Sequence, residues 1–128
     1  MSILVICLFI AVLLTVISKF PLAYAMSKQS KGYDNHHPRT QQSELTGFGA
    51  RALGAHQNSF EALIVFATAS LAAMATNNVS PLMSQLAIAF IIARIIYHCC
   101  YLFNWASLRS LFFTIGYIIC LVMLWMCF

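Results

Sequence analysis

Charged residues are scarce in this sequence. They make up 8% of the 128 residues, whereas hydrophobic residues make up 62%. A water-soluble domain needs a polar surface, and about a quarter of its residues are normally charged. The composition therefore excludes an ordinary soluble fold and predicts an integral membrane protein with a single domain.

Acidic residues and metal-binding patterns are also nearly missing. Seven Lys and Arg against three Asp and Glu give a net charge of +4. The basic residues lie in loops beside apolar segments, so we attribute the excess to membrane orientation and expect no nucleic acid partner. The five cysteines show no C-x-x-C or Cys/His ligand spacing, and His36-His37 has no further ligand nearby. We therefore expect buried, unreactive cysteines and no metal site.

Long apolar runs make up most of the sequence. They predict four spanning helices, at residues 3–26, 47–76, 82–103 and 108–128. Each is long enough to cross a hydrocarbon layer of about 30 Å. Residues 27–46 form the long polar stretch and are expected to be a loop, with Thr46 as a candidate N-cap. The predicted fold class is an all-α, four-helix transmembrane bundle.

The first apolar run has an alternative interpretation as a cleaved signal peptide. Ala23-Tyr24-Ala25 imitates an A-x-A cleavage site. However, no Lys or Arg precedes the apolar core, and that core is longer than a signal peptide requires. A retained membrane helix is the favoured interpretation.

The basic residues predict how the helices are oriented. Lys28, Lys31 and Arg39 lie in the first loop, whereas the turn at 77–80 contains no basic residue. The positive-inside rule then places the first loop in the cytoplasm and both termini on the outer side. Most of the unusual polar groups consequently fall at the cytoplasmic end.

These polar groups share helical faces. The groups are Arg51, Asn58 and Glu61 on the second helix, Arg94, Tyr97 and Tyr101 on the third, and Arg109 at the start of the fourth. An ionisable group at the centre of a membrane helix costs about 2.5 to 3.5 kcal/mol when unpaired, so it usually faces the bundle interior or a polar ligand.

Two explanations compete for this set. Glu61 and Arg94 lie at similar depths on neighbouring helices and can simply neutralise each other as packing contacts. One carboxylate cannot pair with three arginines, however. A surplus of cations beside amide and phenol groups suits an anionic, peptide-like small molecule that enters from the cytoplasm.

Two spaced motifs make a family recognisable. Ala55-His56-Gln57-Asn58-Ser59-Phe60-Glu61 resembles the R-A-x-x-N-x-x-E stretch of the MAPEG family, the membrane-associated proteins in eicosanoid and glutathione metabolism. Ala93-Arg94-x-x-Tyr97-x-x-x-Tyr101 resembles its A-R-x-x-Y-x-x-x-Y motif. The resemblance covers essentially the whole chain. It implies a bacterial-type homotrimer of the inner membrane, with glutathione as co-substrate between subunits and a lipophilic substrate that arrives from the membrane lipid.

The resemblance also implies residue roles. Asn58 and Glu61 would bind the glutathione backbone, while Tyr97 and Tyr101 would line its site. Arg51 would contact a glutathione carboxylate. These five residues form the predicted glutathione-binding set, together with an arginine on the third helix.

That arginine is Arg94, which would brace Glu61. Arg109 falls within one residue of the position where the family holds the glutathione sulfur as a thiolate, so it is the predicted catalytic cation. The sequence departs from the family at Gly54, where many family enzymes carry the arginine that opens the motif.

Several functions remain open at this point. The implied activity is that of a glutathione-dependent transferase or peroxidase acting on lipophilic electrophiles. A non-catalytic lipid or glutathione binding protein of the same fold is the alternative, and Gly54 favours it. A small multidrug transporter is disfavoured, because such exporters need an acidic residue in the first helix and this chain has none there.

Overall fold

The computed structural model describes residues 2–128 and contains helices but no strands over that range. The helices are α1 (Ile3–Ile17), α2 (Lys19–Ser27), α3 (Pro38–Ser43), α4 (Phe48–Ala75), α5 (Pro81–Leu102) and α6 (Ala106–Trp125). Four stretches are long and apolar enough to cross a membrane: α1 with α2, then α4, α5 and α6. The chain is an all-α integral membrane protein, as predicted.

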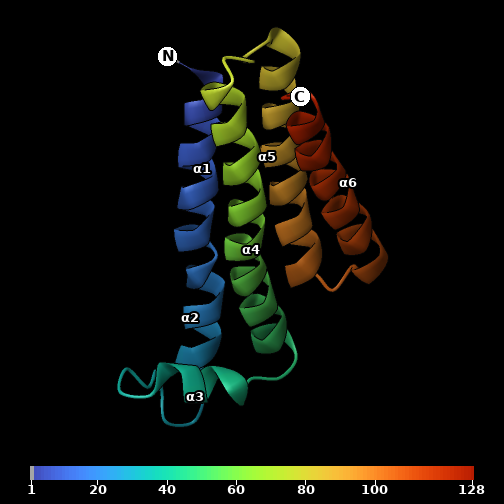
Figure 1. Cartoon of the computed structure of the whole chain (residues 1–128). Coiled ribbons are helices and arrows are strands. Elements are labelled where there is room, and N and C mark those ends of the chain that lie inside the picture. Colours follow the sequence, from blue (N-terminus) through green and yellow to red (C-terminus); the bar gives the residue numbers. More distant parts are fainter. Residues whose placement is uncertain (1) are drawn as a thin grey trace.

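The helices run alternately up and down (Figure 1). Both termini and the turn between α4 and α5 lie at one end of the bundle, and the first loop with α3 lies at the other. We call the latter the first-loop end. α1 packs against α4 and α5, and α6 packs against the same two helices. α4 and α5 are therefore the central pair, and α4 also contacts α2 and α3.

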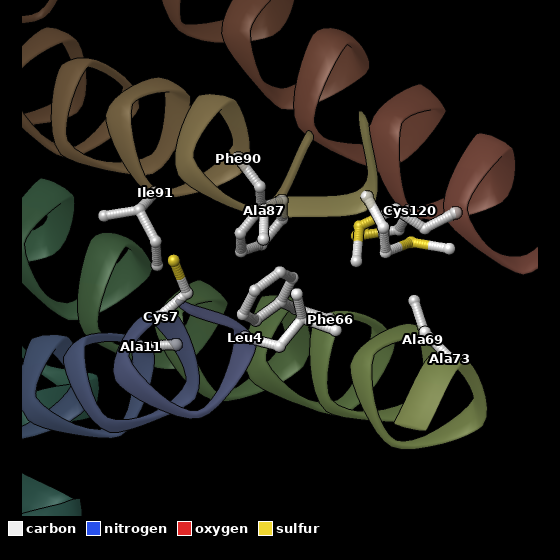
Figure 2. Close-up of a cluster of buried hydrophobic side chains, with 12 residues drawn as sticks. Leu4, Cys7, Ala11, Phe66, Ala69, Ala73, Ala87, Phe90, Ile91 and Cys120 are labelled. Carbon is white, nitrogen blue, oxygen red and sulfur yellow. The ribbon is translucent and has the colours of Figure 1, made fainter. Parts of the chain in front are cut away.

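The hydrophobic core joins four helices with small and aromatic residues. Figure 2 shows Phe66 of α4 facing Phe90 of α5, and their rings stack with centroids 4.2 Å apart. Ala69, Ala73 and Ala87 are fully buried beside them. Lipid is as apolar as these side chains, so helices in membranes associate through close packing, which small residues permit.

The first spanning helix is interrupted at Ser18, between α1 and α2. The Ser18 side chain is 2% exposed and lies 2.8 Å from Nδ1 of His56 and 3.2 Å from Oγ of Ser59. It also donates to the carbonyl of Thr15 at 2.9 Å. This polar cluster ties the α1–α2 junction to α4, because each buried polar group there has a partner.

The first loop differs from the sequence expectation in two respects. It contains the short helix α3, and α4 begins after Gly47, which has a positive φ of 55°, and not after a Thr46 cap. One side chain organises this loop: Gln41 accepts from the Asp34 amide at 2.9 Å and donates to the carbonyls of Met26 and Gly32. A buried amide that can both donate and accept stabilises an otherwise irregular segment.

The last helix shows the largest shift in bounds relative to the sequence-based ranges. It begins at Ala106 and ends at Trp125, whereas residues 108–128 were expected. Asn104 takes a positive φ of 61°, which reverses the chain after α5 and lets α6 begin early. Arg109 therefore lies in the first turn of α6.

Candidate functional site

A cavity of about 310 Å³ opens between α4, α5 and α6 at the first-loop end. We call it the outer cavity. It is lined by Asn58, Tyr97, Tyr101, Arg109, Ser110, Phe113 and Thr114. Four residues of the predicted site, from three different helices, therefore line one space.

The cation of the outer cavity is held against an aromatic ring. The guanidinium carbon of Arg109 lies 4.6 Å from the ring centroid of Tyr101. Tyr97 meets the same tyrosine edge to face, at 5.8 Å between centroids. The negative face of an aromatic ring attracts a guanidinium, so this arrangement restrains where the half-buried Arg109 points.

Gly54 makes room for this ring. A Cβ placed on Gly54 would lie 2.7 Å from Cζ of Tyr101 and would overlap its phenol oxygen. The tip of Tyr101 thus occupies the space that a side chain at position 54 would use. An arginine at position 54, as in many family enzymes, would therefore collide with Tyr101 in its present position.

A second cavity lies deeper between the same three helices and measures about 110 Å³. We call it the inner cavity. Its polar lining includes Asn58, Glu61 and Arg94, and its apolar lining includes Phe90 and Phe113. Asn58 and Phe113 line both cavities and form their common wall.

Asn58 and Glu61 are joined within α4. The Asn58 amide nitrogen donates to Oε2 of Glu61 at 3.1 Å, as the i, i+3 spacing allows. Oδ1 of Asn58 is buried without a hydrogen-bond partner in the described residues. Glu61 itself is exposed on the surface of the single chain although it lies in the middle of a spanning helix.

The sequence-based pairing of Glu61 with Arg94 is absent from the chain. Between residues 2 and 128, the one contact at ion-pair distance joins His37 to Asp34, at 3.9 Å. Arg94 is 7% exposed, and its guanidinium lies 4.1 Å from the ring centroid of Tyr97. Glu61 accepts from its own helix while Arg94 stacks on the residue one turn later, so the two charges share the inner cavity without direct contact.

Arg51 lies apart from these groups. It lines neither the outer nor the inner cavity, and its buried Nε has no partner in the described part of the chain. It precedes Gly54 by one helical turn, on the half of α4 that faces the first loop. Its predicted contact with a glutathione carboxylate stays a prediction.

Sequence reasoning missed three residues of the outer cavity. Ser110, Phe113 and Thr114 follow Arg109 on α6, and the Thr114 hydroxyl donates to the Ser110 carbonyl at 2.9 Å. Helical spacing from Arg109 gives residues 112 and 113 as its neighbours along the same face. That signal, applied to α6, would have indicated Phe113.

The histidines and cysteines lie outside the outer cavity. His98, a candidate general base beside Tyr97, instead lines a small cavity of about 20 Å³ with Ser59 and Arg94, and its Nε2 is buried without a partner in the described chain. Within residues 2–128, no group of three or more His, Cys, Asp or Glu residues could hold a metal ion, and all five cysteines are free.

Comparison with known proteins concerns the chain as a whole. The model of the MAPEG family matches residues 3–128, essentially the whole chain. No curated protein and no solved structure matches it.

Proposed function

Because the chain belongs to the MAPEG family, we propose that it is a membrane-bound, glutathione-dependent transferase or peroxidase acting on lipophilic electrophiles. Family members are membrane-associated proteins of eicosanoid and glutathione metabolism. The observation that carries the proposal is the outer cavity, where Arg109, Tyr97, Tyr101 and Asn58 meet. A cation with phenol and amide groups suits a small anionic peptide.

Arg109 is the proposed catalytic cation. The pKa of a thiol, ordinarily about 8.5, must drop by roughly 1.5 units, or about 2 kcal/mol, for the thiol to be half ionised at pH 7. A positive charge about 4 Å away supplies about 1 kcal/mol in water but about 4 kcal/mol at an effective dielectric constant near 20. Arg109 is half-buried and stacked on Tyr101, and this partial screening supports its role.

The proposed transfer step needs no other cofactor. The glutathione sulfur forms a bond to an electrophilic carbon, and either a leaving group departs with its electron pair or the resulting carbanion takes a proton from water. Toward a hydroperoxide, the sulfur attacks the O–O bond and releases an alcohol, leaving a sulfenic acid. A second glutathione then forms the disulfide and releases water.

The other groups are assigned to binding. Asn58, which lines both cavities, and Glu61, at the polar edge of the inner cavity, would hold the glutathione backbone, with the Glu61 carboxylate facing its ammonium group. Tyr97 would line the site, while Arg94 holds a positive charge in the inner cavity. Apolar residues of the inner cavity, such as Phe90, suit a lipophilic co-substrate.

The proposal includes assembly and orientation. Glu61 is exposed on the single chain in the middle of a spanning helix, and a carboxylate facing lipid is costly. A homotrimer, the general state of the family, would cover it. The basic residues of the first loop support a cytoplasmic location for that loop, in an inner bacterial membrane, with both termini on the outer side.

Calorimetric titration of the detergent-purified protein with glutathione tests this function, together with thiolate absorbance and turnover of an electrophile. The wild type should bind glutathione and give a thiolate signal, and Arg109→Ala should lose that signal. Arg39→Ala, which removes an exposed arginine of α3, is the control. Absence of glutathione binding by the wild type, or unchanged turnover in Arg109→Ala, would contradict the proposal.

A second function is a non-catalytic binding protein with the same fold. Gly54 favours it, because an arginine that many family enzymes carry is missing there. Stopped-flow absorbance separates the two functions. A binding protein would take up glutathione without forming thiolate.

A further inference from the structure

We propose that Tyr101 is a positioning residue that aims Arg109 at the reacting sulfur, and that Gly54 exists to give Tyr101 its place. The inference rests on the proposed glutathione chemistry. It goes beyond that chemistry by assigning the geometry of the cation to a contact between α4 and α5.

The first step is the contact between Gly54 and Tyr101. The tip of the phenol ring lies so close to the Gly54 backbone that a Cβ there would meet both Cζ, at 2.7 Å, and the phenol oxygen. Real Cβ atoms do not approach other atoms this closely. The present position of the ring therefore requires glycine at 54, since any other residue displaces the end of the tyrosine side chain.

The second step is the contact between Tyr101 and Arg109. Tyr101 belongs to α5, and the hydroxyl end of its ring reaches Gly54 of α4. The guanidinium of Arg109, on α6, lies 4.6 Å from the centroid of the same ring. One side chain thus connects three helices at the wall of the outer cavity. If the ring moves, the platform for Arg109 moves with it.

The third step is the effect of the Arg109 position on the pKa of the glutathione thiol. A guanidinium lowers the pKa of a thiol appreciably only at short distance and away from bulk water. Arginine side chains are long and have many rotamers, so an unsupported Arg109 in the first turn of α6 would spend time away from the sulfur. A ring that restrains the cation raises the fraction of time in which it can act.

The paired substitutions Tyr101→Phe and Tyr101→Leu test which part of the side chain matters. Tyr101→Phe keeps the ring and should weaken glutathione affinity through the lost hydroxyl while retaining the pH midpoint of thiolate formation. Tyr101→Leu removes the ring, so it should raise that midpoint and lower kcat at pH 7 by about threefold to tenfold. Equal midpoints in the two variants would overturn the inference.

Gly54→Ala tests the role of the glycine. The added methyl should push the ring aside, raise the thiolate midpoint and reduce kcat as Tyr101→Leu does. In a Tyr101→Leu background the same substitution should have no further effect on the midpoint, since no ring remains to be displaced. An unchanged midpoint in Gly54→Ala, or additive effects in the double variant, would overturn the inference.

Controls separate this inference from general damage and from failure of the proposed function. Gly116→Ala places a methyl 3.6 Å from Phe90, an ordinary contact, so its melting temperature measures the effect of replacing a helical glycine. Gly54→Ala should melt within a few degrees of that variant. If the wild type forms no thiolate, both proposals fail. If it does and Gly54→Ala leaves the midpoint unchanged, this inference fails alone.

Discussion

The guanidinium of Arg94 lies on the ring of Tyr97, 4.1 Å from its centroid, and makes no ion pair with Glu61. The arginine is 7% exposed within a spanning helix, and the negative face of the ring offsets part of its charge. This mode of burial requires a cation that is itself flat and delocalised, as the guanidinium group is, so that it can stack on the ring.

Replacement of Arg94 by lysine should therefore lower stability although the charge is kept. A compact ammonium cannot stack on Tyr97 in the same way, and we expect a loss of about 1 to 2 kcal/mol. Thermal melting in detergent measures it. Arg39→Lys, on the exposed surface of α3, should leave the melting temperature unchanged, and an equal melting temperature for Arg94→Lys would contradict the stacking role.

Asn58→Ala should weaken glutathione binding by about tenfold, or about 1.4 kcal/mol. The amide of Asn58 donates to Glu61 at 3.1 Å, and its loss leaves the carboxylate unrestrained. Calorimetry measures the change. Thr68→Ala is the matched control, because that exposed hydroxyl on the same helix bonds only to the carbonyl of Ile64. Similar affinities for the two variants would argue against the binding role of Asn58.

Ser18→Ala should destabilise the protein by about 1 to 2 kcal/mol, since it leaves Nδ1 of His56 without its partner. A double variant with His56→Ala should lose less than the sum of the two single losses. Ser43→Ala, which removes an exposed hydroxyl, provides the control for melting temperature. Strict additivity would show that Ser18 and His56 are not coupled.

The first loop should lose order in acid. The backbone amide of His37, followed by that of His36, donates to Asp34 and holds the pKa of that carboxyl below its ordinary value. This contribution is complete above the unfolded pKa of about 3.9 and is lost as the pH falls through the lowered value in the folded protein.

Hydrogen exchange of the amides at residues 36 and 37 measures this loss, and protection should fall below a pH of about 3.9. Asp34→Asn keeps an oxygen acceptor but cannot titrate, so its loop should show little dependence on pH. If the wild type and Asp34→Asn lost protection in parallel, the carboxylate would not be the titrating group.

The bundle was predictable because the membrane leaves few choices. Backbone groups in lipid must be hydrogen-bonded inside the protein, and a continuous apolar run of the length of residues 82–103 meets this requirement as a helix. Helical spacing also predicted that Tyr97 and Tyr101 share a face, and both line the outer cavity. Such regularities are local, so one sequence suffices to infer them.

The contacts between helices were less predictable. Depth arguments favoured a pair of Glu61 with Arg94, yet rotation of each helix about its axis decides whether side chains at equal depth meet. Gly54 was recognised as a departure from a pattern, but the reason for it lies 47 residues away at Tyr101. The Gln41 side chain also helps to order the first loop, and no local sequence pattern indicates its partners.

Asn58 and Phe113 form the wall that the two cavities share. If a molecule in one cavity turned the Phe113 ring, the volume of the other cavity would change, and occupancy of the two cavities would be energetically linked. Such linkage is reciprocal: if glutathione in the outer cavity raises the affinity of a lipophile in the inner one by some factor, the lipophile raises the affinity for glutathione by the same factor. The order in which the two molecules bind would then leave the stability of the ternary complex unchanged.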